Sequence, residues 1–165
     1  MHSSVVIAAL SAAASLVLLA GCAPEPEPEP AWTEEEAYAA AEETYREYNS
    51  LSLPYGENED ALDYLAPDLR ADEEQTIRDI SERNIRIEGE SQIVNFQPIQ
   101  FDRAGKSIAV LATVCHDDSG VYLVTEDGEK QGARDNPRYA LEVEFATIEG
   151  DFSIVSFAEI ASTEC

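Results

Sequence analysis

The stretch "SIAVLATVC", residues 107–115, is a dense apolar run. Such a run is typical of a strand that is buried on both faces of a sheet. Residues 93–101 alternate along their length and predict a second strand, with Pro98 at a bulge or at the sheet edge. Residues 102–106, which contain a glycine, predict the turn between these two strands. The centre of the chain therefore predicts a pair of antiparallel strands.

More strands are predicted toward the C-terminus. Residues 121–125 form a short apolar segment, and the Asp127-Gly128 pair that follows fits a tight hairpin turn. Residues 138–148 and 152–161 predict a final strand pair around a turn at 149–151. This half of the chain therefore predicts an all-antiparallel sheet.

The residues before these strands predict helices. Thr33 and Glu36 have the spacing of a capping box, and the apolar stripe that follows predicts a helix from Glu34 to about Tyr48. Shorter helices are predicted over residues 60–65 and 72–84. Helices followed by a run of strands predict an α+β domain, with N-terminal helices packed on a curved antiparallel sheet.

The order of these elements resembles the nuclear transport factor 2-like fold, a cystatin-like cone that is also found in ketosteroid isomerase and polyketide cyclases. More closely, the chain resembles small lipoproteins of high-GC Gram-positive bacteria with a SnoaL-like domain of this kind. The segments that carry the resemblance are "AEETYREY" (41–48), Asp68-Leu69 with "DEEQTIRDI" (72–80), and "VCHDDSGVYLVTEDGEK" (114–130), with a cysteine closing the chain. The resemblance covers roughly residues 33–165.

This resemblance implies a ligand site. In such folds the concave face of the sheet and the first helix often enclose an apolar pocket. The candidate pocket-lining residues are the aromatic side chains at and near the first helix: Trp32, Tyr38, Tyr45 and Tyr48. The alternative is a filled core, because aromatic residues at helical spacing usually pack against one another.

The N-terminal segment, residues 1–21, resembles a lipoprotein signal peptide. Residues 5–20 are almost wholly apolar, and Leu19-Ala20-Gly21-Cys22 at the end of this run resembles the lipobox of bacterial lipoproteins. The resemblance implies that Cys22 is acylated with diacylglycerol and anchors the protein on the extracytoplasmic face of the cell membrane. Residues 24–30 alternate proline and glutamate. They predict that residues 22–31 form an extended polyproline II tether to a single domain, residues 32–165.

The net charge of −24 excludes some partners. Nucleic acid and anionic lipid head groups would be repelled by such a field, so neither is expected to bind. The acidic composition serves solubility, or alternatively recruits a basic partner or loosely held cations.

Two cysteines remain after Cys22, which suits a disulfide in an oxidising compartment. We expect Cys115 and Cys165 to form that bridge. Neither cysteine lies in a Cys-x-x-Cys arrangement or beside a Lys or Arg, which argues against a reactive pair.

No catalytic motif is evident in the sequence. His116, Asp117 and Asp118 form a cluster that Asp127 and Glu129 could approach across the predicted hairpin, but a plain turn explains the cluster better than a metal site. The sequence contains no Walker loop, nucleophile elbow or HExxH motif. We therefore expect no metal and no cofactor.

These observations favour a membrane-anchored, non-catalytic lipoprotein that binds a small apolar ligand or an envelope protein partner. The alternative is an isomerase- or cyclase-type enzyme that uses a carboxylate in its pocket. A third hypothesis is an acidic surface that recruits a partner.

The anchor can be tested by changing its acceptor. Cys22→Ser removes the only thiol that the lipobox presents, so we expect it to abolish incorporation of radiolabelled palmitate and to release the protein from the membrane fraction. The bacterial host must process lipoproteins, and Cys165→Ser is the control that should keep the label. Retention of the label in Cys22→Ser would contradict the anchor.

Overall fold

The computed structural model describes residues 32–52, 59–161 and 165. The predicted signal peptide, Cys22 and the whole of the predicted tether therefore lie outside the described residues. The elements, in chain order, are the helix α1 (Glu34–Leu51), the 3₁₀ helix η1 (Glu59–Tyr64), the helix α2 (Pro67–Glu82), and the strands β1 (Arg86–Gly89), β2 (Gln92–Ala104), β3 (Ser107–Asp117), β4 (Val121–Val124), β5 (Lys130–Gly132), β6 (Arg138–Ile148) and β7 (Asp151–Ile160).

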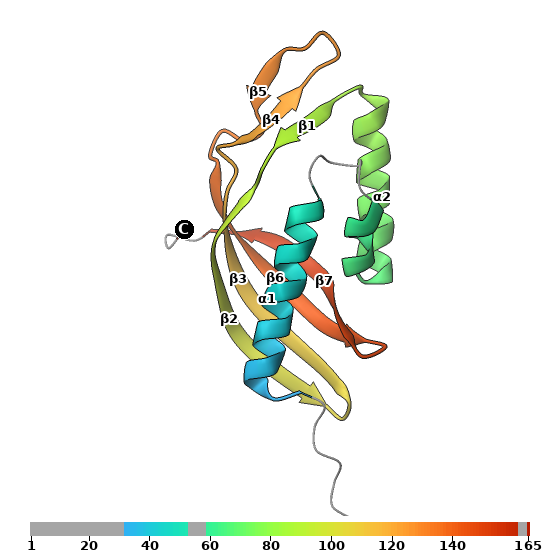
Figure 1. The fold of residues 1–165 in the computed structure, drawn as a ribbon, viewed down its shortest axis with the longest axis vertical. Coiled ribbons are helices and arrows are strands. Elements are labelled where there is room, and N and C mark those ends of the chain that lie inside the picture. Colours follow the sequence, from blue (N-terminus) through green and yellow to red (C-terminus); the bar gives the residue numbers. More distant parts are fainter. Residues whose placement is uncertain (1–31, 53–58, 162–164) are drawn as a thin grey trace, which may run out of the picture.

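These strands form two antiparallel sheets. The larger sheet has the order β2-β3-β6-β7, and the smaller one has the order β1-β4-β5. Figure 1 shows α1 lying across the larger sheet, with α2 beside it and the small sheet extending beyond the end of α1. The α+β class with N-terminal helices on antiparallel strands is confirmed. The single curved sheet is not, because the two sheets stay separate and do not close into the cone that the resemblance implied.

Local signals at the first helix are confirmed. The Thr33 hydroxyl accepts a hydrogen bond from the Glu36 backbone N–H at 3.2 Å, and the Glu36 carboxylate accepts one from the Thr33 backbone N–H at 2.8 Å. The capping box is thereby complete. Ala37 and Ala41 are fully buried on the inner face of α1, and such small side chains let the helix backbone approach the sheet closely.

Three other predictions need correction. The second helix is of the 3₁₀ type, and the third begins at Pro67 rather than at residue 72, because proline suits the first turn of a helix. Strand β3 is fully buried on its core face but only half-buried on most of its outer face. The reason is that α1 covers just one side of the larger sheet. Strand β1 was not predicted from the sequence at all.

Strand β2 lies at the edge of the larger sheet and contains two irregularities, as Pro98 suggested. Its register against β3 shifts between Ile93 and Asn95 and again between Pro98 and Gln100. The extra residues at these shifts are Val94 and Ile99, which are 57% and 51% exposed. Each bulge turns an apolar side chain outward while its neighbours keep their alternation.

The core lies between α1 and the inner face of the larger sheet. Its largest fully buried side chains on that sheet are Val110, Val114, Val143, Phe145 and Ile154. Among the described residues, no helix has the length and apolar character needed to cross a lipid bilayer.

The predicted disulfide is present. Cys115, on the central strand β3, is bonded to Cys165, 50 residues further along the chain, with Cα atoms 5.4 Å apart. This bond ties the C-terminus to the outer face of the larger sheet.

Removing this bond should destabilise the domain. Replacing both cysteines with alanine frees a loop of 50 residues in the unfolded chain, so we expect the free energy of unfolding to fall by about 2–4 kcal/mol. Urea denaturation followed by circular dichroism measures this loss, with the parent protein in dithiothreitol as the matched control. Equal midpoints for oxidised and reduced protein would contradict a stabilising bond.

Candidate functional site

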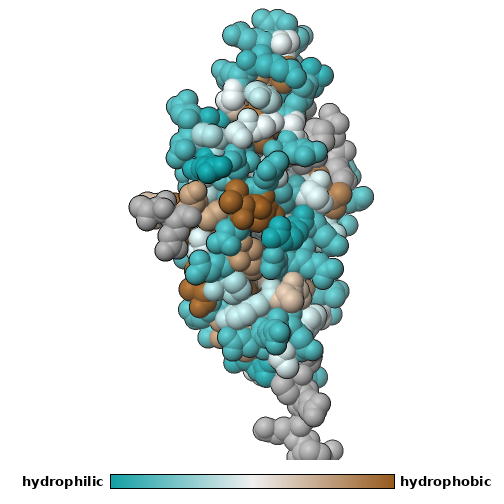
Figure 2. All heavy atoms as spheres, turned by 60° about the vertical axis from the view of Figure 1, so that its left-hand side comes forward, coloured by the Kyte–Doolittle hydropathy of each residue, from teal (hydrophilic) through white to brown (hydrophobic). Residues whose placement is uncertain are grey.

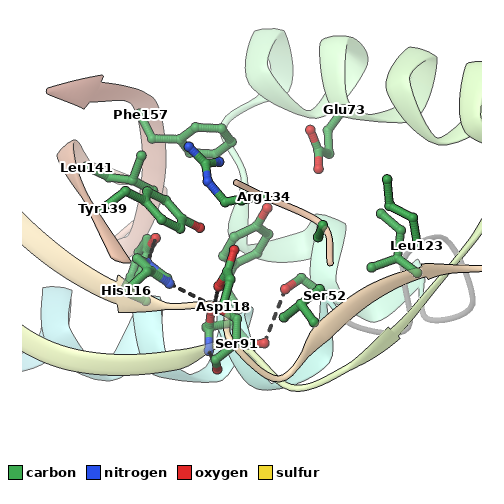
Figure 3. Close-up of a pocket in the computed structure, with 16 residues that line it drawn as sticks. Ser52, Glu73, Ser91, His116, Asp118, Leu123, Arg134, Tyr139, Leu141 and Phe157 are labelled. Atoms are coloured by element: carbon green, nitrogen blue, oxygen red, sulfur yellow. Dashed lines mark hydrogen bonds between the residues drawn. The ribbon is translucent and has the colours of Figure 1, made fainter. Parts of the chain in front are cut away.

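A cavity of about 360 Å³ lies where the two sheets part. We call it the inter-sheet pocket. The larger sheet contributes residues of β3, β6 and β7, and the smaller sheet contributes residues of β1 and β4. Helices α1 and α2 and the connections between elements supply the remaining walls. Figure 3 shows the lining side chains converging from these elements.

The backbones of the two connections between the sheets, from β1 to β2 and from β3 to β4, cross at close range. Gly89 ends β1, and Gly120 lies just before β4. A Cβ atom on Gly89 would lie 1.9 Å from the Gly120 carbonyl oxygen, and Gly89 also has a φ of +109°. Only glycine satisfies both conditions without strain. This crossing lets the chain pass from one sheet to the other beside the pocket.

A buried histidine organises the polar side of the pocket. His116 is 3% exposed, and both of its ring nitrogens have partners. Nε2 lies 2.8 Å from the Tyr45 hydroxyl, and Nδ1 lies 2.9 Å from the Ser91 hydroxyl. Ser91 in turn donates to the Asp118 carboxylate at 2.5 Å. Three segments that are distant in the sequence are joined in this way.

The direction of each hydrogen bond follows from the carboxylate. Asp118 can only accept, so the Ser91 hydroxyl donates its proton to Asp118 and must accept from His116 Nδ1–H. The other ring nitrogen, Nε2, then carries a lone pair that accepts the Tyr45 hydroxyl proton. We therefore assign a neutral imidazole with its proton on Nδ1.

The protonation equilibria agree with this assignment. Burial lowers the pKa of His116 below 6.5, the nearby Asp118 partly opposes this effect, and Arg134 adds to it. Burial also raises the pKa of Tyr45 well above its usual value. Both groups are thus held in their neutral forms at physiological pH.

An aromatic ring and a cation lie next to His116. The Tyr139 ring stacks on the His116 ring at a centroid distance of 5.2 Å and an angle of 14°. The Arg134 guanidinium lies over the Tyr139 ring, 3.8 Å from the ring centroid, and forms an ion pair with Glu159. Burial and, after it, the negative charge of Asp118 raise the pKa of Tyr139.

The remaining walls are largely apolar. Tyr48 stacks with Phe157 at a centroid distance of 6.4 Å, and the side chains of Leu123 and Leu141 also face the cavity. Glu73 of α2 points toward the cavity from its outer side (Figure 3). The pocket thus has apolar walls, one hydrogen-bonded polar side and charges of both signs.

The four predicted pocket residues separate into two pairs. Tyr45 and Tyr48 line the inter-sheet pocket. Trp32 instead packs edge-on against Phe152 at a centroid distance of 5.5 Å, and Tyr38 packs edge-on against Phe101 at 6.3 Å. Those two rings lie near the other end of α1, where the helix packs directly on the sheet.

The predicted His-carboxylate cluster is also divided by the fold. His116 and Asp118 face the pocket, but Asp117 points away and binds Arg138 at 2.9 Å. Hydrogen bonds from Ser119, together with Arg138, lower the pKa of Asp117 to about 2. Asp127 is hydrogen-bonded to Thr125 within its own turn. In the described part of the chain, no group of three or more potential ligands is placed to hold a metal ion.

The pocket residues that sequence reasoning missed include Glu73, Ser91, Arg134 and Tyr139. Ser91 lies between two strands in a segment without special composition, and Arg134 lies in the loop "GARDNP". No local pattern marks either one, since their importance arises from contacts across the two sheets.

Comparisons with known proteins support the fold alone. No family model and no curated protein matches the chain. The fold is similar to that of the intermembrane space region of chloroplast protein ARC6, with a TM-score of 0.54 and 12% identity over 76% of this chain and 97% of that one. The solution structure of RPA3114, a SEC-C motif containing protein from Rhodopseudomonas palustris, covers 76% of this chain and 78% of its own at 14% identity. Its TM-score of 0.38 is too low to bear on the fold.

The buried imidazole predicts a specific pH dependence. As pH falls below 6.5, the unfolded chain takes up a proton that folded His116 resists, so the free energy of unfolding should decline until the lowered folded pKa is passed. His116→Gln should lack this part of the decline. Urea denaturation between pH 8 and pH 5, compared for the two proteins, isolates the effect. A pKa of His116 above 6.5 in nuclear magnetic resonance (NMR) titration would contradict the assignment.

Proposed function

We propose that this protein is a lipid-anchored, extracytoplasmic binding protein whose inter-sheet pocket holds a small ligand with an apolar body. The lipobox-like residues before Cys22 and the nuclear transport factor 2-like and SnoaL-like resemblance support the class of lipoprotein. The diacylglyceryl group on Cys22 would be the membrane contact, and the Pro-Glu tether would hold the domain away from the bilayer.

The pocket itself carries the proposal. Its volume of about 360 Å³ is within the range of small-molecule sites, which are mostly apolar with a few placed polar groups. Here the apolar walls are supplied by side chains such as Leu123, Leu141 and Phe157, and the polar side by the His116 chain.

A protein partner is less well supported by the surface. Figure 2 shows the hydrophobic residues of one face as separate spots among hydrophilic ones. Val94 and Ile99 are exposed because of the β2 bulges. Isolated apolar side chains are common on monomers and do not make an interface.

The enzyme alternative needs a pocket carboxylate as its catalytic group. Asp118 lines the pocket and is joined to Ser91, His116 and Tyr45 in a chain that resembles a proton relay. A general base must offer a lone pair to its substrate. In His116, however, both ring nitrogens are engaged with protein hydroxyls, and Ser91 donates its proton to Asp118 rather than attacking a ligand. This arrangement favours a polar wall of fixed shape over a catalytic group.

Filling the pocket tests binding. Leu123→Trp places a larger ring in the cavity, whereas Tyr122→Trp changes the adjacent residue on β4, which is exposed and does not line the pocket. With 2-phenylethanol as a neutral probe, NMR titration of the parent protein should shift residues around the pocket saturably. We expect Leu123→Trp to weaken this binding at least about tenfold and Tyr122→Trp to leave it unchanged.

Two outcomes would contradict the proposed function. One is a set of shifts spread over the surface without saturation, and the other is equal binding by both tryptophan variants. Thermal unfolding of each variant is the control that it remains folded.

A further inference from the structure

We propose that the inter-sheet pocket selects a small organic cation, an ammonium or guanidinium group carried on an apolar body. This inference rests on the proposed function, namely that the pocket binds a small ligand, and it adds the charge of that ligand. Three features of the lining carry it: the hydrogen-bond groups left for a ligand, the sign of the charges, and the aromatic faces.

The polar side of the pocket offers acceptors and few donors. The Tyr45 hydroxyl donates to His116, and the Ser91 hydroxyl donates to Asp118. The side-chain amide of Asn49 donates to the Ser91 carbonyl at 2.9 Å. These protons are used within the protein, while the Tyr45 oxygen and the carboxylate keep lone pairs. A ligand that supplies N–H donors complements such a wall, and a ligand with only acceptors does not.

The charges around the pocket favour a cation. Two carboxylates line it, Asp118 at its polar side and Glu73 on α2, against the single guanidinium of Arg134. The charge of Glu73 also acts on the inside of the pocket. Burial is the main cause of the raised pKa of Tyr48, and the charge of Glu73 is the next. The net charge of −24 on the whole chain attracts cations toward the domain.

A cation already lies on the aromatic wall. The Arg134 guanidinium stacks over the ring of Tyr139, with its central carbon 3.8 Å from the ring centroid. Aromatic faces attract cations through their quadrupole, and the effect grows where water is excluded. The neighbouring pair of Tyr48 and Phe157 offers further ring surface to the same cavity. Arg134 therefore marks a position that suits a ligand cation and competes for it.

The other ligand charges fit less well. An anion could pair with Arg134, but it would face Asp118 and Glu73 across a pocket of only about 360 Å³. A neutral body without donors would cover the remaining lone pairs of Tyr45 and Asp118 without bonding to them, which carries a desolvation cost. An anionic ligand and a neutral ligand therefore predict other effects of the variants below than a cationic ligand does.

A series of three probes of similar size tests the charge. NMR titrations at low ionic strength would compare 2-phenylethylamine, 2-phenylethanol and 3-phenylpropionate, which are cationic, neutral and anionic at pH 7. We expect the amine to bind about tenfold more tightly than the alcohol, and the carboxylate to bind most weakly.

Charge-neutralising variants locate the effect. Glu73→Gln should weaken amine binding about threefold more than it weakens alcohol binding. Asp72→Asn is the matched control. It removes the same charge from the neighbouring residue of α2, whose side chain does not line the pocket. Arg134→Met keeps the apolar stem, removes the competing cation and should strengthen amine binding.

Each remaining outcome decides between the proposals. Tightest binding of 3-phenylpropionate, or loss of amine binding in Arg134→Met, would overturn the cation proposal. Equal binding of amine and alcohol, or equal effects of Glu73→Gln and Asp72→Asn, would also overturn it while the proposed ligand-binding function stands. If none of the three probes shifts residues of the pocket, the proposed function itself fails.

Discussion

The buried imidazole of His116 is the constraint on which the functional end of the molecule depends. A histidine ring that is removed from water needs a partner for each nitrogen, since an unsatisfied buried polar group costs about 1–3 kcal/mol. The partners here come from α1 and from the connection between β1 and β2, and Ser91 is completed by the turn after β3. Among the described residues, no buried side-chain nitrogen or oxygen atom lacks a partner. One hydrogen-bonded chain thereby fixes a helix, a loop and a turn relative to one another.

The same junction explains why a cavity exists at this end and a filled core at the other. Near its start, α1 presents alanines to the larger sheet, and the backbones approach closely. Toward its end it presents Tyr45 and Tyr48, and the chain crosses into the smaller sheet at Gly89 and Gly120. The smaller sheet diverges from the core beyond that crossing (Figure 1). The space between the two sheets becomes the pocket because α2 and β7 close only part of it.

Several ion pairs lie at the surface and contribute little to stability, because exposed pairs are weakened by water and salt. Arg134 differs from these, since its guanidinium also covers an aromatic ring inside the pocket. Arg134 thus joins an acidic side chain, Glu159, to the aromatic lining of the pocket.

Much of the fold was predictable from local patterns. The capping box at Thr33 and Glu36, the strand pair around Gly150 and the bulge near Pro98 depend on residues that are near one another in sequence. The disulfide followed from the cysteine count. The 3₁₀ form of η1, strand β1 and the division into two sheets had no comparable signal, because short segments take their structure from tertiary contacts.

The sequence by itself determined the α+β order, the first helix and the Cys115–Cys165 bond, since periodicity, capping and pairing of cysteines are written in local residue types. Only the tertiary structure decided which aromatic residues line a cavity and which fill the core. Tyr38 and Tyr45 lie on the same stripe of α1, yet only Tyr45 meets the inter-sheet pocket. The physical reason is that a pocket depends on where two sheets part, and that point is set by a glycine crossing and by contacts among Tyr45, Ser91 and His116.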